Sequence, residues 1–296
     1  MSAEVAYAGS SLAAVSCAEE CCSPDTSAAC YVEQNYSFEY AATFGPSELV
    51  ERDAVFTAAI FADASKVLRS FNTWTFKREQ PSNSQLMLRV VASAIASSKP
   101  IPFVLYWGKG PRQQVAAPDV QCLDFLAALS ERVKSSYAPG AGIRLIFTDT
   151  HAELNGHPAE CIKHYFDNVR LEAHRRGFDT CSLGELVKMA GNGATATPLD
   201  EVVSEGLLAI LITSAVKWYH GSASPKEGAL AYLRMNLIEQ RVVEHSYPES
   251  IFITFNGSRL RPLFPRQLPI FYMYSLRRGF SVKPWFLPGD YKSSRD

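Results

Sequence analysis

Two short apolar runs constrain the fold of this chain more than any other feature. The first is IPFVLYW at Ile101–Trp107, and the second is IRLIFT at residues 143–148. Each run is short and bounded by turn-forming residues, which is typical of strands buried on both faces of a sheet. A segment with helical apolar spacing separates them, at residues 118–133, and another follows at residues 158–176. This alternation predicts crossover units in a mostly parallel sheet.

The flanking sequence predicts further helices and a second group of strands. Apolar residues at helical spacing indicate helices over residues 54–71 and 82–99, before the first strand. Ser224-Pro-Lys-Glu227 is a capping box with proline at the first helical position, so a helix is expected from there to about Glu244. Asn256-Gly257 is a strong hairpin-turn signal. We therefore expect an α/β fold: a mostly parallel, Rossmann-like sheet flanked by helices, with a C-terminal antiparallel hairpin.

Charge and hydropathy exclude several functional classes. The 296 residues are 47% apolar and 20% charged, and the net charge is −1. No global field attracts nucleic acid or an anionic membrane surface, so we expect neither as a partner. The longest apolar candidate, residues 207–216, is shorter than the roughly 18 residues that a membrane-spanning helix needs. The first residues contain no basic leader, so we expect a cytoplasmic protein.

The chain is expected to form one catalytic domain preceded by an arm. Residues 1–46 are rich in Ala, Ser and Cys and carry little pattern, whereas residues 47–296 carry the helix and strand signals. The seven cysteines are an odd number, which favours reduced thiols. Four of them fall in the arm: Cys17, Cys21, Cys22 and Cys30. Their spacing fits no metal template well, so a loosely packed segment is favoured over a zinc or iron–sulfur site.

The first candidate site follows the first strand, because ligands of open α/β sheets bind outside the carboxyl ends of parallel strands. There, GKGPR places Lys109 and Arg112 among glycines. Glycines permit close approach of the backbone to a ligand, and the two cations can bind phosphate or carboxylate. A solvated basic turn is the alternative.

The second candidate site follows the second strand, where TDTHAELNGH gathers five polar side chains. Asp149 falls at the strand end, and His151 can exchange protons near neutral pH. Asn155 is a candidate substrate contact. His151, Glu153 and His157 are an alternative set of metal ligands, although their spacing matches no established motif. The third alternative is an ordinary polar loop.

The expected hairpin carries a third set of cations. Arg259 and Arg261 alternate, so on a strand they share one face and can hold a substrate carboxylate. A charged, solvent-exposed edge face is the alternative.

Taken in order, these segments resemble the isocyanide (isonitrile) synthases, which include the pyoverdine/dityrosine biosynthesis proteins. The family's K/R-P-I strand with its lysine-bearing loop is similar to SKPIPFVLYWGKGPR, and its P-D helix to APDVQCLDFLAALSERV. Its Y-P-P-G-A turn and strand ending in S-D-G are similar to SYAPGAGIRLIFTDTHAELNGH. Its Y-P-x-x-I strand and late Pro-Trp pair correspond to SYPESIFITF and Pro284-Trp285. The resemblance covers about residues 75–290, and this chain departs from the family at Thr148-Asp149-Thr150, as a divergent member would.

The resemblance implies a reaction between a free amino acid and a pentulose phosphate, ribulose 5-phosphate. The α-amino group condenses with the sugar ketone, the sugar supplies the isonitrile carbon, and no cofactor is expected. In this interpretation Lys109 and Arg112 hold phosphate. Asp149 moves protons, with His151 nearby. Arg259 or Arg261 is expected to bind the carboxylate of the amino acid, and only their positive charge supports this assignment.

Two other readings of the sequence stay open. One is a metal-dependent oxygenase or hydrolase that acts on an amino acid through His151, Glu153 and His157. The other is a non-catalytic module that binds a small anionic ligand. If the isonitrile reaction is retained, its pathway partner is expected to be an iron/2-oxoglutarate oxygenase or a peptide synthetase.

Overall fold

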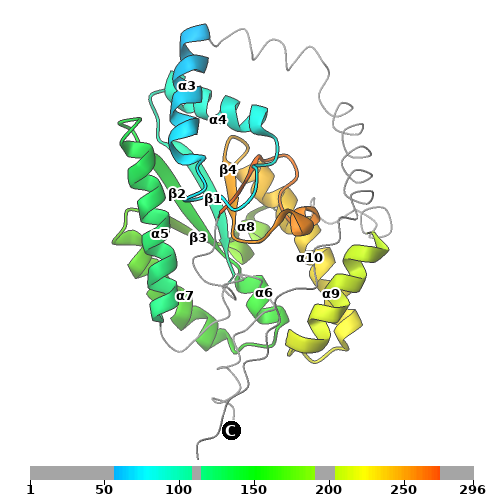
Figure 1. Ribbon diagram of the computed structural model, residues 1–296. Coiled ribbons are helices and arrows are strands. Elements are labelled where there is room, and N and C mark those ends of the chain that lie inside the picture. Colours follow the sequence, from blue (N-terminus) through cyan, green and yellow to red (C-terminus); the bar gives the residue numbers. More distant parts are fainter. Residues whose placement is uncertain (1–56, 109–114, 191–203, 274–296) are drawn as a thin grey trace, which may run out of the picture. The chain divides into compact units, whose positions relative to one another are not determined.

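A computed structural model describes residues 57–108, 115–190 and 204–273 of the chain (Figure 1). The predicted N-terminal arm and its four cysteines lie outside the described residues, as do Lys109 and Arg112. The division into an arm and one catalytic domain stays a prediction.

In the described part of the chain, five strands form one sheet in the order β3-β2-β1-β4-β5, and every neighbouring pair is parallel. The strands are β1 (Ile101–Trp107), β2 (Ala141–Phe147), β3 (Asp179–Ser182), β4 (Ile251–Thr254) and β5 (Ile270–Tyr272). The predicted α/β class and its mostly parallel, Rossmann-like sheet are therefore confirmed. The two strands that were predicted from apolar runs pair along their whole lengths, from Ile101 with Ala141 to Trp107 with Phe147.

Helices cover both faces of this sheet, which explains why β1 is apolar throughout. Phe103, Leu105 and Trp107 belong to the larger core cluster, whereas Val104 belongs to a second one. Successive residues of a strand point to opposite faces, so the two clusters lie on the two faces. The larger cluster packs against α3 (Ala58–Phe71), α4 (Ser84–Ala96), α5 (Ala117–Lys134) and α7 (Ala159–His174).

The second face is covered by α8 (Leu183–Ala190) and α10 (Pro225–Ser246), and α9 (Glu205–Trp218) packs on α10. The helix α10 begins at the predicted capping box, in which the Ser224 side chain accepts from the backbone of Glu227. No helix in the described ranges is both long and apolar enough to cross a bilayer.

The predicted C-terminal antiparallel hairpin is wrong. After β4 the chain enters the 3-10 helix η3 (Ser258–Leu263), and β5 then joins β4 in parallel. Gly257 has a φ of −78°, whereas the tight hairpin turn of an Asn-Gly pair needs positive φ at both residues. Pro262 within η3 also lacks the N–H that a ladder requires.

Two further elements differ from the expectation. No helix was predicted between the second strand and residue 158, but Asp149–Leu154 form a short helix, α6. The strand β3 was not predicted, because its four residues, DTCS, are polar or small, and none of them is fully buried. Neither element carries the apolar periodicity on which the prediction relied.

Candidate functional site

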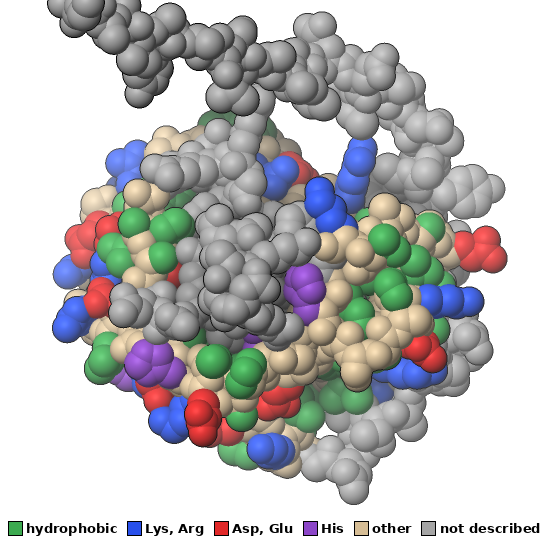
Figure 2. All heavy atoms as spheres, turned by 90° about the horizontal axis from the view of Figure 1, so that it is seen from below, with side chains coloured by type: hydrophobic (Ala, Val, Ile, Leu, Met, Phe, Trp, Pro, Cys, Tyr) green, Lys and Arg blue, Asp and Glu red, His purple; other side chains and the backbone are tan. Residues whose placement is uncertain are grey.

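The carboxyl ends of β1 and β2 are joined by hydrogen bonds at the edge of the sheet where a ligand is expected. The backbone N–H of Thr148 donates to the carbonyl oxygen of Trp107 at 3.3 Å, and its hydroxyl donates to the same oxygen at 3.1 Å. Gly108 follows Trp107, and α6 begins directly after Thr148. In Figure 2, which shows the molecule from below the view of Figure 1, the coloured Lys/Arg and Asp/Glu side chains are scattered and form no single charged patch.

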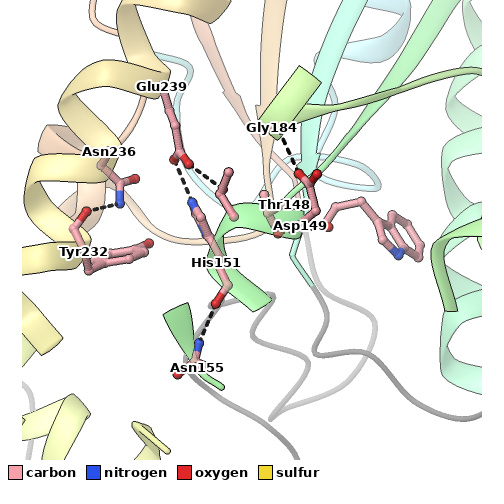
Figure 3. A network of polar contacts seen from close by, with 10 residues as sticks. Thr148, Asp149, His151, Asn155, Gly184, Tyr232, Asn236 and Glu239 are labelled. Atoms are coloured by element: carbon pink, nitrogen blue, oxygen red, sulfur yellow. Dashed lines mark hydrogen bonds and ion pairs between the residues drawn. The ribbon is translucent and has the colours of Figure 1, made fainter. Parts of the chain in front are cut away.

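His151 forms the central polar contact of this region. Its Nε2 lies 2.7 Å from Oε2 of Glu239, and the two side chains are only 3% and 1% exposed. The hydroxyl of Thr150 donates to the other carboxylate oxygen of Glu239 at 2.6 Å. Figure 3 shows Glu239 of α10 directed toward His151 of α6. A buried ion needs such compensation, because removal from water is costly.

This arrangement sets the proton positions on the imidazole. With Glu239 ionised, Nε2 carries a proton and donates it to the carboxylate, so in the neutral ring Nδ1 has the lone pair. His151 Nδ1 is buried and has no hydrogen-bond partner among the described residues. The pair therefore has the composition of a general base oriented by a carboxylate.

A pocket opens at the carboxyl ends of β1, β2 and β4, and His151 lines it. Its walls are mainly apolar and aromatic, and none of its described lining residues is Asp, Glu, Lys or Arg. Apolar pockets with a few polar groups are typical of small-molecule sites. The described lining residues are Tyr106, Gly108, Thr148, His151, Ile210, Leu211, Ser214, Tyr232, Asn236, Phe252, Ile253, Thr254, Phe255, Asn256, Leu260, Leu263 and Phe264.

Tyr106 contributes the second polar atom of the pocket that lacks a hydrogen-bond partner among the described residues. Its hydroxyl is buried and has no hydrogen-bond partner within the described ranges. Burial, and after it the negative charge of Glu239, raises the pKa of Tyr106 well above its ordinary value of 10. The hydroxyl is therefore neutral at any physiological pH.

Asp149 lies apart from this pocket. Its carboxylate accepts a hydrogen bond from the backbone N–H of Gly184 at 2.9 Å and another from the hydroxyl of Ser182. Figure 3 shows its side chain turned toward Gly184, on the opposite side from His151. It joins α6 to the first turn of α8. The structure thus brings Asp149 and His151 onto one short helix but directs them to different neighbours.

The other predicted polar contacts are placed as follows. Asn155 is buried at the end of α6, where its amide donates to the carbonyl oxygen of His151 at 2.9 Å. Arg259 is exposed. The guanidinium of Arg261 donates to the carbonyl oxygens of Pro265 and Arg266 at 2.9 and 2.8 Å. Because η3 replaces the expected strand, the two arginines do not share a strand face.

The alternative metal site does not form. Residues 151 and 153 of a helix point in nearly opposite directions, and Glu153 is exposed whereas His151 and His157 are buried. Within the ranges that the structure describes, no three His, Cys, Asp or Glu side chains are grouped so that they could hold a metal ion.

Sequence reasoning missed the residues that α10 supplies. Tyr232, Asn236 and Glu239 are four and three residues apart, so they share one helix face, and all three are buried. Asn236 donates to the carbonyl oxygen of Tyr232 at 2.8 Å. An Asn and a Glu on the face of a helix that also carries buried apolar residues are a detectable signal, because such groups are rarely buried without partners or function.

The sequence and the fold were compared with those of known proteins. No protein-family model matches the sequence, and no curated protein matches it. The crystal structure of the PvcA protein from Pseudomonas aeruginosa is similar, with a TM-score of 0.58 and 20% identity, over 76% of this chain and 88% of that chain. A tyrosyl-tRNA synthetase from Archaeoglobus fulgidus complexed with L-tyrosine gives a TM-score of 0.46 and 14% identity, over 72% and 65% of the two chains. The chain therefore shares the fold of PvcA, and its resemblance to the isocyanide synthases is confirmed at the level of the fold.

Proposed function

We propose that this protein is an amino-acid-modifying enzyme of the isocyanide synthase type. It condenses the α-amino group of an amino acid with a pentulose phosphate, ribulose 5-phosphate, to form an isonitrile. Two observations support the proposal: the fold shared with PvcA, a protein of the pyoverdine and isocyanide synthase type, and the order of the sequence motifs. The single observation that carries it is the buried His151–Glu239 pair at the pocket.

The pair suits the first chemical step of this reaction. A free amino acid carries an ammonium group, which is not nucleophilic until it loses a proton. His151 accepts that proton at Nδ1, and Glu239 stabilises the imidazolium that results. The nitrogen then attacks the ketone carbon of the sugar phosphate. A C–N bond forms and the ketone oxygen leaves as water, which gives an imine; both C–C bonds of that carbon to the rest of the sugar must then break before it is the isonitrile carbon.

The remaining roles follow from charge and placement. Lys109 and Arg112 come directly after β1, so they are proposed to hold the phosphate. Asp149 already accepts two hydrogen bonds at the start of α8, so we assign the proton transfer to His151 and leave Asp149 as an anchor of α6. Arg261 holds backbone carbonyls and is assigned no carboxylate contact. An iron/2-oxoglutarate oxygenase or a peptide synthetase is the proposed consumer of the product.

Mass spectrometry tests the reaction directly. Purified protein is incubated with each proteinogenic amino acid and with ribulose 5-phosphate carrying ¹³C at the ketone carbon. We expect one or a few amino acids to yield a product that retains the label as its isonitrile carbon. His151→Gln should abolish the product, whereas His164→Gln, on the exposed side of α7, should not. A folded protein that binds these substrates but releases no labelled product would instead be a non-catalytic binding module.

A further inference from the structure

Tyr106 is a partly buried residue of β1 whose hydroxyl is buried but unsatisfied. It lies one residue before the end of β1, and its ring packs edge-on against Phe252, with 5.0 Å between ring centroids. It faces the pocket, and its hydroxyl is buried without a hydrogen-bond partner among the described residues. A buried polar group without a hydrogen bond destabilises the folded protein. A phenylalanine would avoid this cost, so the hydroxyl is expected to bind a ligand.

The second unsatisfied atom of the same pocket is His151 Nδ1. The two rings are neighbours, with 6.3 Å between their centroids and an edge-on arrangement. Because the Nε2 proton is donated to Glu239, the free ring nitrogen is an acceptor. The phenolic oxygen of Tyr106 can also accept. One ligand group with two or more donor hydrogens can therefore satisfy both atoms.

The charges near Tyr106 indicate whether the ligand group that binds there is anionic or cationic. Glu239 and Glu244 both act on its hydroxyl with negative charge. No Lys or Arg is found among the described residues that line the pocket. A ligand carboxylate at this position would be repelled, whereas an ammonium group would be attracted. The aromatic side chains of Tyr232 and Phe252 in the same walls are also compatible with a cation.

We propose that Tyr106 Oη and His151 Nδ1 form an amine-binding subsite, which receives the amino group of the substrate as an ammonium ion. The inference rests on the proposed function and deepens it, because it fixes where the reacting nitrogen lies. The ammonium group donates one hydrogen bond to each atom, and the one to His151 lies on the path of proton removal. The rest of the substrate extends along the apolar walls.

A pair of probes that differ only in the nitrogen tests this subsite without any turnover. 2-Phenylethylamine and 2-phenylethanol have the same skeleton and no carboxylate, and their affinities can be measured by titration calorimetry. A hydrogen bond to a charged group is worth about 1.5–3 kcal/mol, which corresponds to an affinity ratio of roughly 10- to 100-fold. We expect the amine to bind at least about tenfold more tightly than the alcohol. Equal affinities, or no binding of the amine, would overturn the subsite.

Two hydroxyl deletions separate this role from packing. Tyr106→Phe keeps the ring, so it should stay folded and lose about tenfold or more in affinity for the amine, with unchanged affinity for the alcohol. Tyr137→Phe is the matched control, because that hydroxyl donates to the carbonyl oxygens of Ala94 and Lys99, away from the pocket. Its amine-to-alcohol ratio should equal that of the wild type. If the Tyr106 variant also keeps the wild-type ratio, the subsite is wrong.

These experiments distinguish failure of the amine-binding subsite from failure of the proposed reaction. An amine preference that depends on Tyr106 supports the subsite even if no isonitrile forms with any amino acid. Conversely, labelled isonitrile formed equally well by the wild type and by Tyr106→Phe would retain the reaction and reject the subsite.

Discussion

The hydroxyl of Tyr165 donates a hydrogen bond to the buried carboxylate of Asp119 at 3.1 Å, and the indole of Trp107 donates to that hydroxyl at 3.3 Å. The second oxygen of Asp119 accepts from the backbone N–H of Ala116 at 2.9 Å. Trp107 ends β1 and Ala116 precedes α5. The carboxylate therefore joins the two ends of the connection that contains Lys109, at the edge of the sheet where the pocket lies.

Removal of this carboxylate is expected to destabilise the protein. Asp119→Ala deletes a helix cap and leaves the buried hydroxyl of Tyr165 without its acceptor, so the free energy of unfolding should fall by about 2–4 kcal/mol. Urea denaturation measures the loss. Asp124→Ala is the control on the same helix, because Asp124 is exposed and forms only a surface ion pair with Arg176, worth less than about 1 kcal/mol. Equal losses in the two variants would contradict the role of the buried network.

Glu239→Gln is expected to reduce turnover far more than it reduces stability. The amide keeps the shape and can still accept from Thr150, but it no longer neutralises the imidazolium that forms when His151 takes a proton. We expect the rate of isonitrile formation to fall by roughly 100-fold or more, as for other carboxylate-oriented histidines. Single-turnover mass spectrometry measures the rate, with the exposed Glu249→Gln as control. A rate within threefold of the wild type would contradict the proposed role of Glu239 in stabilising the imidazolium of His151.

The elements that the sequence predicted correctly are those whose signals are local. The apolar run of β1 and the capping box at Ser224 are each complete within a few residues, and both appear where expected. The strand β3 was missed because its pairing with β2, not its own polar sequence, makes it a strand. Asn256-Gly257 led to the wrong prediction of a hairpin, because this pair favours a tight turn but does not require one. In the structure, a 3-10 helix and the parallel strand β5 bury the apolar residues that follow.

The site was predictable in part for the same reason. His151 was found because it follows a strand end, where the topology of parallel sheets brings functional groups. Glu239 was not found, since its place on the apolar face of α10 indicates burial but does not identify its partner, which is 88 residues away. Asp149 was correctly placed after the strand, but the direction of its side chain depends on the tertiary position of Gly184.

Gly184 is required by the close approach of Asp149. A Cβ atom at position 184 would lie 2.8 Å from Oδ2 of Asp149, which is closer than side-chain contacts allow. Gly184→Ala should therefore displace the carboxylate and lower the free energy of unfolding by about 1–3 kcal/mol. Gly206→Ala in α9 is the opposite case, because nothing lies within 4 Å of its Cβ position. There alanine should stabilise by up to about 1 kcal/mol through helix propensity, and urea denaturation of both variants checks the contrast.

Glu244 should make the stability of the protein fall as the pH rises above the ordinary range of a carboxyl group. Burial raises its pKa above 4.5, even though the backbone N–H groups of Arg266 and Gln267 donate to its carboxylate. The folded protein thus holds this proton more tightly than the unfolded chain. Its stabilising contribution is complete below the unfolded pKa and is lost as the pH rises through the raised value.

The variant Glu244→Gln isolates this contribution, because glutamine can accept the same backbone hydrogen bonds but does not titrate. The free energy of unfolding of the wild type minus that of Glu244→Gln is expected to decrease between pH 4 and pH 7, measured by urea denaturation at each pH. For Glu227→Gln the same difference in the free energy of unfolding should increase with pH. Hydrogen bonds from Ser224 lower the pKa of Glu227, so its carboxylate stabilises the fold above the ordinary pKa of a carboxyl group, and this stabilisation is lost as the pH falls through the lowered value. A pH-independent difference for Glu244 would mean that its carboxyl group is as well solvated in the folded protein as in the unfolded chain.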